Sequence, residues 1–140
     1  MTTPEFFTTP GYGETLLANL HYHQAVRVGD RVEISGQGGW DDAFNFPESL
    51  EEEIVVAFDN VERTLALAGA TWRDVIHVNS YHIPDAADSI GDGHNRVMVE
   101  QFRKRMGDRS PIWTQIGVVA LGAPKMRVEI RVTAIAGDRG

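Results

Sequence analysis

Alternating apolar and polar residues predict five strands along this chain. The first two, at residues 20–28 and 31–36, form a hairpin around Gly29-Asp30. A third strand is predicted over residues 75–83, and two closing strands over residues 113–119 and 126–136, joined by a turn at 122–124. A period of two is typical of a strand that buries one face, and glycine next to aspartate favours a tight turn.

Two other segments carry apolar residues at spacings of three and four, which predict helices over residues 48–68 and 94–105. Ser49 is placed to cap the first helix, and Gly69 is placed to end it. The acidic residues 51–53 are expected to form a solvated first turn rather than a binding patch. His94 lies at the expected start of the second helix, where a polar residue is unremarkable.

The predicted order of elements is therefore β-β-α-β-α-β-β, within one domain that covers residues 1–140. Residues 1–12, rich in Thr, Pro and Gly, are expected to form an N-terminal arm. Hairpins combined with single crossover helices indicate an α+β fold, in which a mixed sheet carries two helices on one face.

Composition excludes several classes of function. Thirteen Lys and Arg against twenty Asp and Glu give a net charge of −7, which argues against a nucleic-acid partner. The chain has no cysteine, so disulfides, thiolate metal sites and a cysteine nucleophile are excluded. It has no long apolar run to span a membrane and begins without the features of a signal peptide, so we expect a cytoplasmic protein.

Candidate chemistry is sparse when the residues are taken alone. His21 and His23 would share a face of the first strand, but no third metal ligand lies at a fixed spacing from them. Glu129 lies on the last strand, with Arg127 and Arg131 on the same face. One interpretation is a solvent-facing strand with ion pairs, and the other is a carboxylate held ionised by the two cations and available to a site.

Several ordered segments resemble the Rid/YjgF family, also labelled reactive-intermediate imine deaminases or endoribonuclease L-PSP proteins. The first strand is similar to the family's Pro-Tyr-Ser-Gln-Ala segment, and the second carries its Ser-Gly-Gln. The resemblance extends from about residue 20 to residue 136. Its segments are His21-Tyr22-His23-Gln24-Ala25, Val28-Gly29-Asp30, Ser35-Gly36-Gln37, Ala57-Phe58-Asp59-Asn60, Ala68-Gly69-Ala70, Asn95-Arg96, Glu100-Gln101-Phe102, Pro111 and Val128-Glu129-Ile130.

This resemblance implies a six-stranded sheet with two helices, a homotrimer, and sites in the clefts between subunits. Family members studied as enzymes hydrolyse enamines and imines to a ketone and ammonia without a cofactor. The resemblance assigns Glu129 as the group that orients or activates water. Residues expected to shape the substrate pocket are Tyr22, Ser35, Gly36, Trp113 and Gln115.

The sequence departs from the family where the substrate carboxylate is clamped. The family's Pro-Ala-Arg-Ser segment is Pro111-Ile112-Trp113-Thr114 here, so an indole replaces the arginine. Gln115 replaces a small residue, and His23 replaces the serine of the first motif. Trp113 and Gln115 should share a strand face that points into the cleft. Loss of a bidentate charged contact, roughly 1.5–3 kcal/mol, should weaken binding of small imino acids.

Two functions are compatible with this departure. The first is a hydrolytic deaminase of larger, aromatic or less carboxylate-dependent imines. The second is a trimeric protein that keeps the cleft, binds a small ligand and has lost the chemistry. For Trp113 itself, the alternative to a role in the pocket is packing at a trimer interface. The negative net charge weighs against ribonuclease activity, which one family label implies.

Overall fold

The computed structural model describes residues 3–137. Six strands form one mixed sheet in the order β1-β2-β3-β6-β4-β5. The strands are β1 (Glu5–Phe7), β2 (Ala25–Val28), β3 (Arg31–Ile34), β4 (Val75–His82), β5 (Ile112–Gly117) and β6 (Val128–Ile135). The helices are α1 (Tyr12–Leu20), α2 (Leu50–Leu67) and α3 (Asp92–Met106), with a short 3₁₀ turn, η1 (Trp72–Asp74), before β4.

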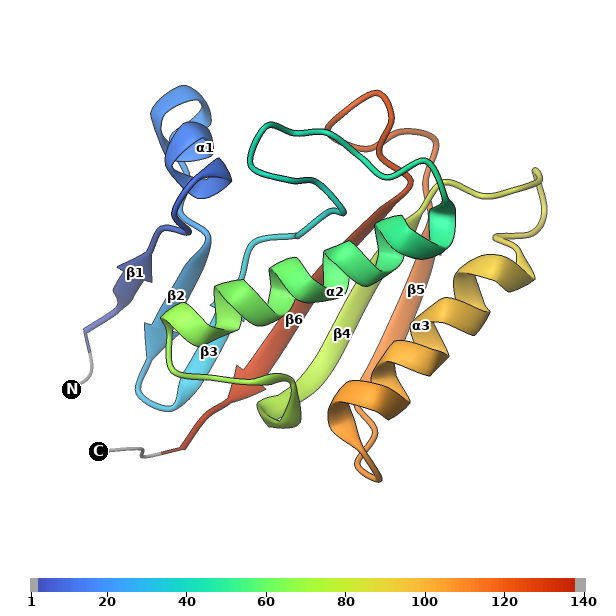
Figure 1. Cartoon of the computed structure of the whole chain (residues 1–140). Coiled ribbons are helices and arrows are strands. Elements are labelled where there is room, and N and C mark those ends of the chain that lie inside the picture. Colours follow the sequence, from blue (N-terminus) through green and yellow to red (C-terminus); the bar gives the residue numbers. More distant parts are fainter. Residues whose placement is uncertain (1–2, 138–140) are drawn as a thin grey trace.

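The core lies between the sheet and two helices, α2 and α3, which cover the same face of the sheet (Figure 1). The alternation along β6 explains this layering, because Val128, Ile130 and Val132 are completely buried in this core. Glu129 and Arg131 alternate with them and lie on the opposite face, which we call the open face. The α+β fold with two helices on one face is as predicted.

Local signals placed the first hairpin and the long helix correctly. Val28 pairs with Arg31, which leaves Gly29 and Asp30 as a two-residue turn, and Gly29 has a φ of 61°. The Ser49 side chain accepts a hydrogen bond from the Glu52 amide at 3.0 Å and caps α2. Gly69 follows α2 with a φ of 80°, which a side chain would disfavour.

The N-terminal region differs from the prediction. Where an N-terminal arm was predicted, β1 pairs with β2 and adds an edge to the sheet, and α1 follows it. Residues 20–24, predicted as strand, belong to the end of α1 and a loop, because His21 adopts a φ of 59° and ends the helix. Residues 1 and 2 of the predicted arm lie outside the described residues.

The two closing strands do not form a hairpin. β5 runs parallel to β4, and β4 separates it from β6. The crossover through α3 brings β5 parallel to β4, and the segment after β5 carries the chain past β4 to the far side. Among residues 3–137, no helix is long and apolar enough to cross a membrane.

Glu53 corrects the expectation of a fully solvated acidic turn. Its side chain is completely buried and accepts hydrogen bonds from Arg127, at 2.6 Å from Nε and 2.7 Å from the backbone amide. A buried carboxylate needs such a partner, because an isolated charge in the core is costly. This ion pair fixes α2 to the segment that enters β6, two residues before Glu129.

Candidate functional site

The Glu129 carboxylate lies on the open face of the sheet, directly over Gly36. A Cβ atom added at Gly36 would overlap the Glu129 carboxylate, so this close approach requires glycine. The backbone of Gln37 holds the glycine there, because it exchanges two hydrogen bonds with Ile130, at 2.8 and 2.9 Å. The Ser-Gly-Gln motif thus places glycine, rather than a side chain, beside the candidate base.

Tyr22 lies close enough to Glu129 for their charges to interact. Burial raises the pKa of the Tyr22 phenol, and the negative charge of Glu129 raises it further. Burial also raises the pKa of the Glu129 carboxyl, because a half-buried carboxylate loses hydration. Tyr81 is the register partner of Glu129 on β4, which places a second phenol beside it on the open face.

The neighbouring arginines do not hold Glu129 ionised, which corrects one interpretation of the sequence. Arg127 is bound to Glu53, and Arg131 binds Glu33 at 3.1 Å and Asn79 at 3.2 Å. Among residues 3–137, no ion pair involves Glu129. Desolvation therefore dominates, and the pKa of Glu129 is raised rather than lowered. A carboxyl with a raised pKa is a stronger base than an exposed glutamate.

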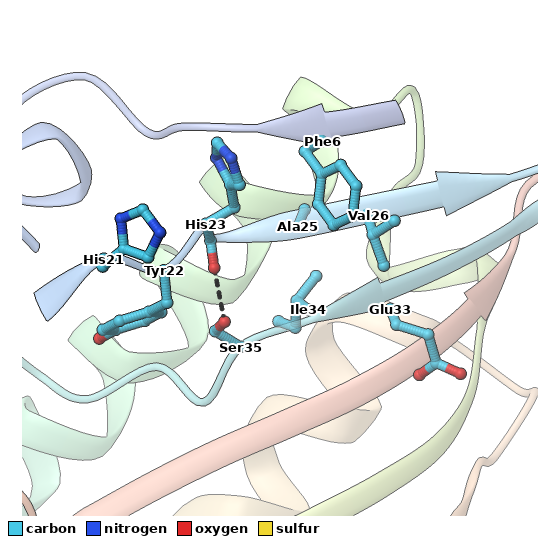
Figure 2. A pocket seen from close by; sticks show the side chains of 9 residues that line it. All are labelled: Phe6, His21, Tyr22, His23, Ala25, Val26, Glu33, Ile34 and Ser35. Carbon is cyan, nitrogen blue, oxygen red and sulfur yellow. Dashed lines mark hydrogen bonds between the residues drawn. The ribbon is translucent and has the colours of Figure 1, made fainter. Parts of the chain in front are cut away.

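A groove of about 410 Å³ runs beside this cluster, between β1, β2 and β3 (Figure 2). Tyr22 and His21 lie at one end of it, and Phe6 and Val26 lie at the other. Ser35 lines the same groove, and its hydroxyl donates a hydrogen bond of 2.7 Å to the His23 carbonyl. The structure therefore brings together four predicted site residues, namely Tyr22, Ser35, Gly36 and Glu129.

Trp113 and Gln115 share a strand face, as the alternation predicts, but within one chain this is the face that carries α3. The Trp113 ring packs edge-on against Phe102, with ring centroids 5.2 Å apart. The Gln115 side-chain amide donates to Asn95 Oδ1 at 2.6 Å. These two residues thus lie on the opposite face of the sheet from Glu129, and only a second chain could bring them to the same cleft.

A line of polar side chains runs from the half-buried Trp113 into the core, where the other three members are buried. We call this line the polar relay: Trp113, Ser80, His82 and His94. Trp113 Nε1 donates to Ser80 Oγ at 2.8 Å, and Ser80 Oγ is 2.8 Å from His82 Nε2. His82 Nδ1 is 2.9 Å from His94 Nδ1. Burial lowers the pKa of His82 to about 3, with a further contribution from His94. Burial also lowers the pKa of His94, so both buried rings disfavour a positive charge.

The polar relay was not predicted from the sequence. His82 and His94 come from different elements, and their 12-residue separation has no standard motif. The one available signal was the inward position of His82 on β4, where an alternating pattern places apolar residues.

His21 and His23 do not share a strand face, which corrects the prediction for this pair. His21 ends α1 instead of lying on a strand, and the His23 ring stacks near Phe6, with centroids 5.2 Å apart. In the part of the chain that the structure describes, no three His, Cys, Asp or Glu side chains are grouped to hold a metal ion. The chemistry available at the Glu129 cluster is acid–base chemistry at a carboxyl flanked by phenols.

Comparison with known proteins places this geometry in a family. The sequence profile of the family described as endoribonuclease L-PSP matches residues 13–136. RutC family protein YjgH of Escherichia coli (strain K12) is 31% identical over 122 residues, which cover 86% of this chain and 88% of YjgH.

Solved structures agree. A structure of protein YjgH matches with a TM-score of 0.75 at 29% identity and covers 96% of both chains. RidA from the Antarctic bacterium Psychrobacter sp. PAMC 21119 matches with a TM-score of 0.69 at 28% identity, over 81% of this chain and 87% of RidA. The fold, the Ser-Gly-Gln approach to Glu129 and these matches lead to one conclusion: the chain belongs to the endoribonuclease L-PSP family, which includes the Rid and YjgF proteins.

Proposed function

We propose that this protein is a cofactor-independent deaminase that hydrolyses imines or enamines to a ketone and ammonia, with Glu129 as the base. The observation that carries the proposal is the Glu129 carboxylate, held over Gly36 beside Tyr22 with a pKa raised by burial. The proposal includes a homotrimer with sites between subunits, a small-molecule substrate and a cytoplasmic location. It includes neither nucleic acid nor membrane as a partner.

The chemistry needs one group that takes and returns protons. Water oxygen bonds to the carbon of a protonated imine, the C=N π electrons move to nitrogen, and Glu129 takes a proton from the water. Glu129 then protonates the amine nitrogen of this carbinolamine. The C–N bond breaks with its electrons on nitrogen, ammonia leaves, and the hydroxyl proton passes to Glu129 and on to ammonia. A carboxyl with a raised pKa suits both directions of transfer.

The replacement of the family's arginine by Trp113 changes which substrates we expect to bind. A family arginine at position 113 would offer a fixed cation to a carboxylate, whereas Trp113 offers an apolar ring whose N–H is already bound to Ser80. The proposed substrates are therefore larger, aromatic or less dependent on a carboxylate than small 2-imino acids.

Ammonia release from a panel of small, branched and aromatic imines generated in situ tests the proposal. Glu129→Gln keeps the shape of the side chain but removes the base, so we expect turnover to fall by about 10²- to 10⁴-fold. Glu51→Gln makes the same chemical change on the exposed surface of α2 and should leave turnover unchanged. Full activity in Glu129→Gln would refute the assignment of the base.

The second candidate, a protein that binds a small ligand without turnover, is favoured by the missing arginine. The same panel separates the two functions. Binding of the product ketones by a protein that releases no ammonia from any imine would support the binding protein and reject the deaminase.

A further inference from the structure

The polar relay starts from a donor. A tryptophan N–H can only donate, so Ser80 Oγ accepts from Trp113. A serine oxygen has two lone pairs and one hydrogen, so Ser80 Oγ either donates to His82 Nε2 or accepts from it. His82 Nδ1 and His94 Nδ1 share one hydrogen bond.

The Gln115 side chain connects the relay to Asn95. Its amide nitrogen lies 3.5 Å from His82 Nε2. The same nitrogen donates to Asn95 Oδ1 at 2.6 Å. Gln115 Oε1 takes part in neither contact.

Two polar atoms of this pair are left without partners. Within residues 3–137, neither Gln115 Oε1 nor Asn95 Nδ2 has a hydrogen-bond partner. Asn95 is exposed at the start of α3 and Gln115 is half-buried on β5. This hydrogen-bonded pair of side chains therefore keeps one acceptor and one donor that no other described residue uses.

We propose that Gln115 and Asn95 form an acceptor–donor pair that selects a ligand with an uncharged carboxamide-type group over one with a carboxylate. A carboxamide can donate its N–H to Gln115 Oε1 and accept from Asn95 Nδ2 with its carbonyl. A carboxylate has only acceptors, so one of its oxygens would face Gln115 Oε1 without a hydrogen bond. This inference rests on the proposed function and names its substrate class.

Dissociation constants for pyruvamide and pyruvate test the inference without turnover, because these product-type ketones differ only in the terminal group. We expect the wild-type protein, at fixed salt and pH, to bind pyruvamide about 10-fold more tightly or better. Gln115→Met keeps the length and net charge of the side chain but removes the acceptor, so the preference should fall by at least about 5-fold.

One further variant serves as the control. Thr114→Val changes the adjacent, exposed residue on the other face of β5 and should keep the preference.

Equal or tighter binding of pyruvate by the wild type, an unchanged preference in Gln115→Met, or no binding of either ketone would overturn the inference. The binding preference and the release of ammonia are measured separately, so failure of this inference can be told apart from failure of the proposed function. A protein that releases no ammonia but prefers pyruvamide through Gln115 would reject the deaminase and keep the ligand class. A protein that releases ammonia but prefers pyruvate would do the reverse.

Discussion

Acid should destabilise this protein through the buried histidines His82 and His94, and replacing both by glutamine should remove most of that sensitivity. Neither ring has room for water, since the two residues are 0% and 1% exposed. Their facing Nδ1 atoms share one hydrogen bond, which needs a lone pair on one of the rings. A proton added to either ring would bury a charge.

The size of the effect follows from proton linkage. Burial lowers the pKa of folded His82 from 6.5 to about 3. Below pH 6.5 the unfolded chain therefore binds a proton that the folded chain does not. The stability from the neutral ring is present above pH 6.5 and is lost as the pH falls toward 3. Between pH 7 and pH 5 the loss for His82 is about 2 kcal/mol. The pKa of His94 is also lowered, chiefly by burial, which adds a loss of the same sign.

Urea unfolding at pH 7, 6 and 5, at one protein concentration and one ionic strength, measures this loss. The free energy of unfolding of the wild type should fall by about 2 kcal/mol or more from pH 7 to pH 5. The double variant His82→Gln/His94→Gln should start less stable at pH 7 but lose much less over the same interval. Equal losses in the two proteins, or a wild type that is more stable at pH 5, would refute the reasoning.

Two other substitutions test contacts around the site. Gly36→Ala places a methyl group where the Glu129 carboxylate lies, so ammonia release should fall about 10- to 100-fold with little change in the melting temperature; equal activity would show that the close approach does not matter. Glu53→Gln weakens the buried pair with Arg127 and should cost about 3 kcal/mol in urea unfolding; a loss below about 1 kcal/mol would contradict a structural role for this pair.

Local patterns were sufficient for the elements that bury one regular face. The apolar stripe of α2 and the alternation of β6 specify both the element and its orientation, so the layering of the sheet followed from the sequence. α1 was missed because its apolar residues, Tyr12, Leu16, Leu17 and Leu20, follow a short segment rich in Pro and Gly. Residues 20–24 also alternate between apolar and polar, and nothing local reveals that the backbone of His21 turns to end the helix.

The site was predictable only where neighbours in space are also neighbours in a motif. The resemblance placed Glu129 and Gly36 in the same site, but it could not predict that the pKa of the Glu129 carboxyl is raised. Its arginine neighbours in sequence are bound to Glu53 and Glu33, which lie far from it in the sequence. The contacts of Gln115 and Trp113 could not be predicted for the same reason. Their partners, Asn95 and Ser80, lie on α3 and β4, which pack against β5 only in the folded protein.

The separation of Glu129 from Trp113 and Gln115 by the thickness of the sheet has a consequence for mixtures of variants. A cleft that uses both groups must take Glu129 from one subunit and Gln115 from another. A subunit that lacks Glu129 and a subunit that lacks Gln115 each still carry one intact half. When the two are refolded together, some of the mixed assemblies contain a cleft with both halves intact. Two preparations that are each defective would then recover part of their function on mixing, and dilution below the assembly threshold would remove it.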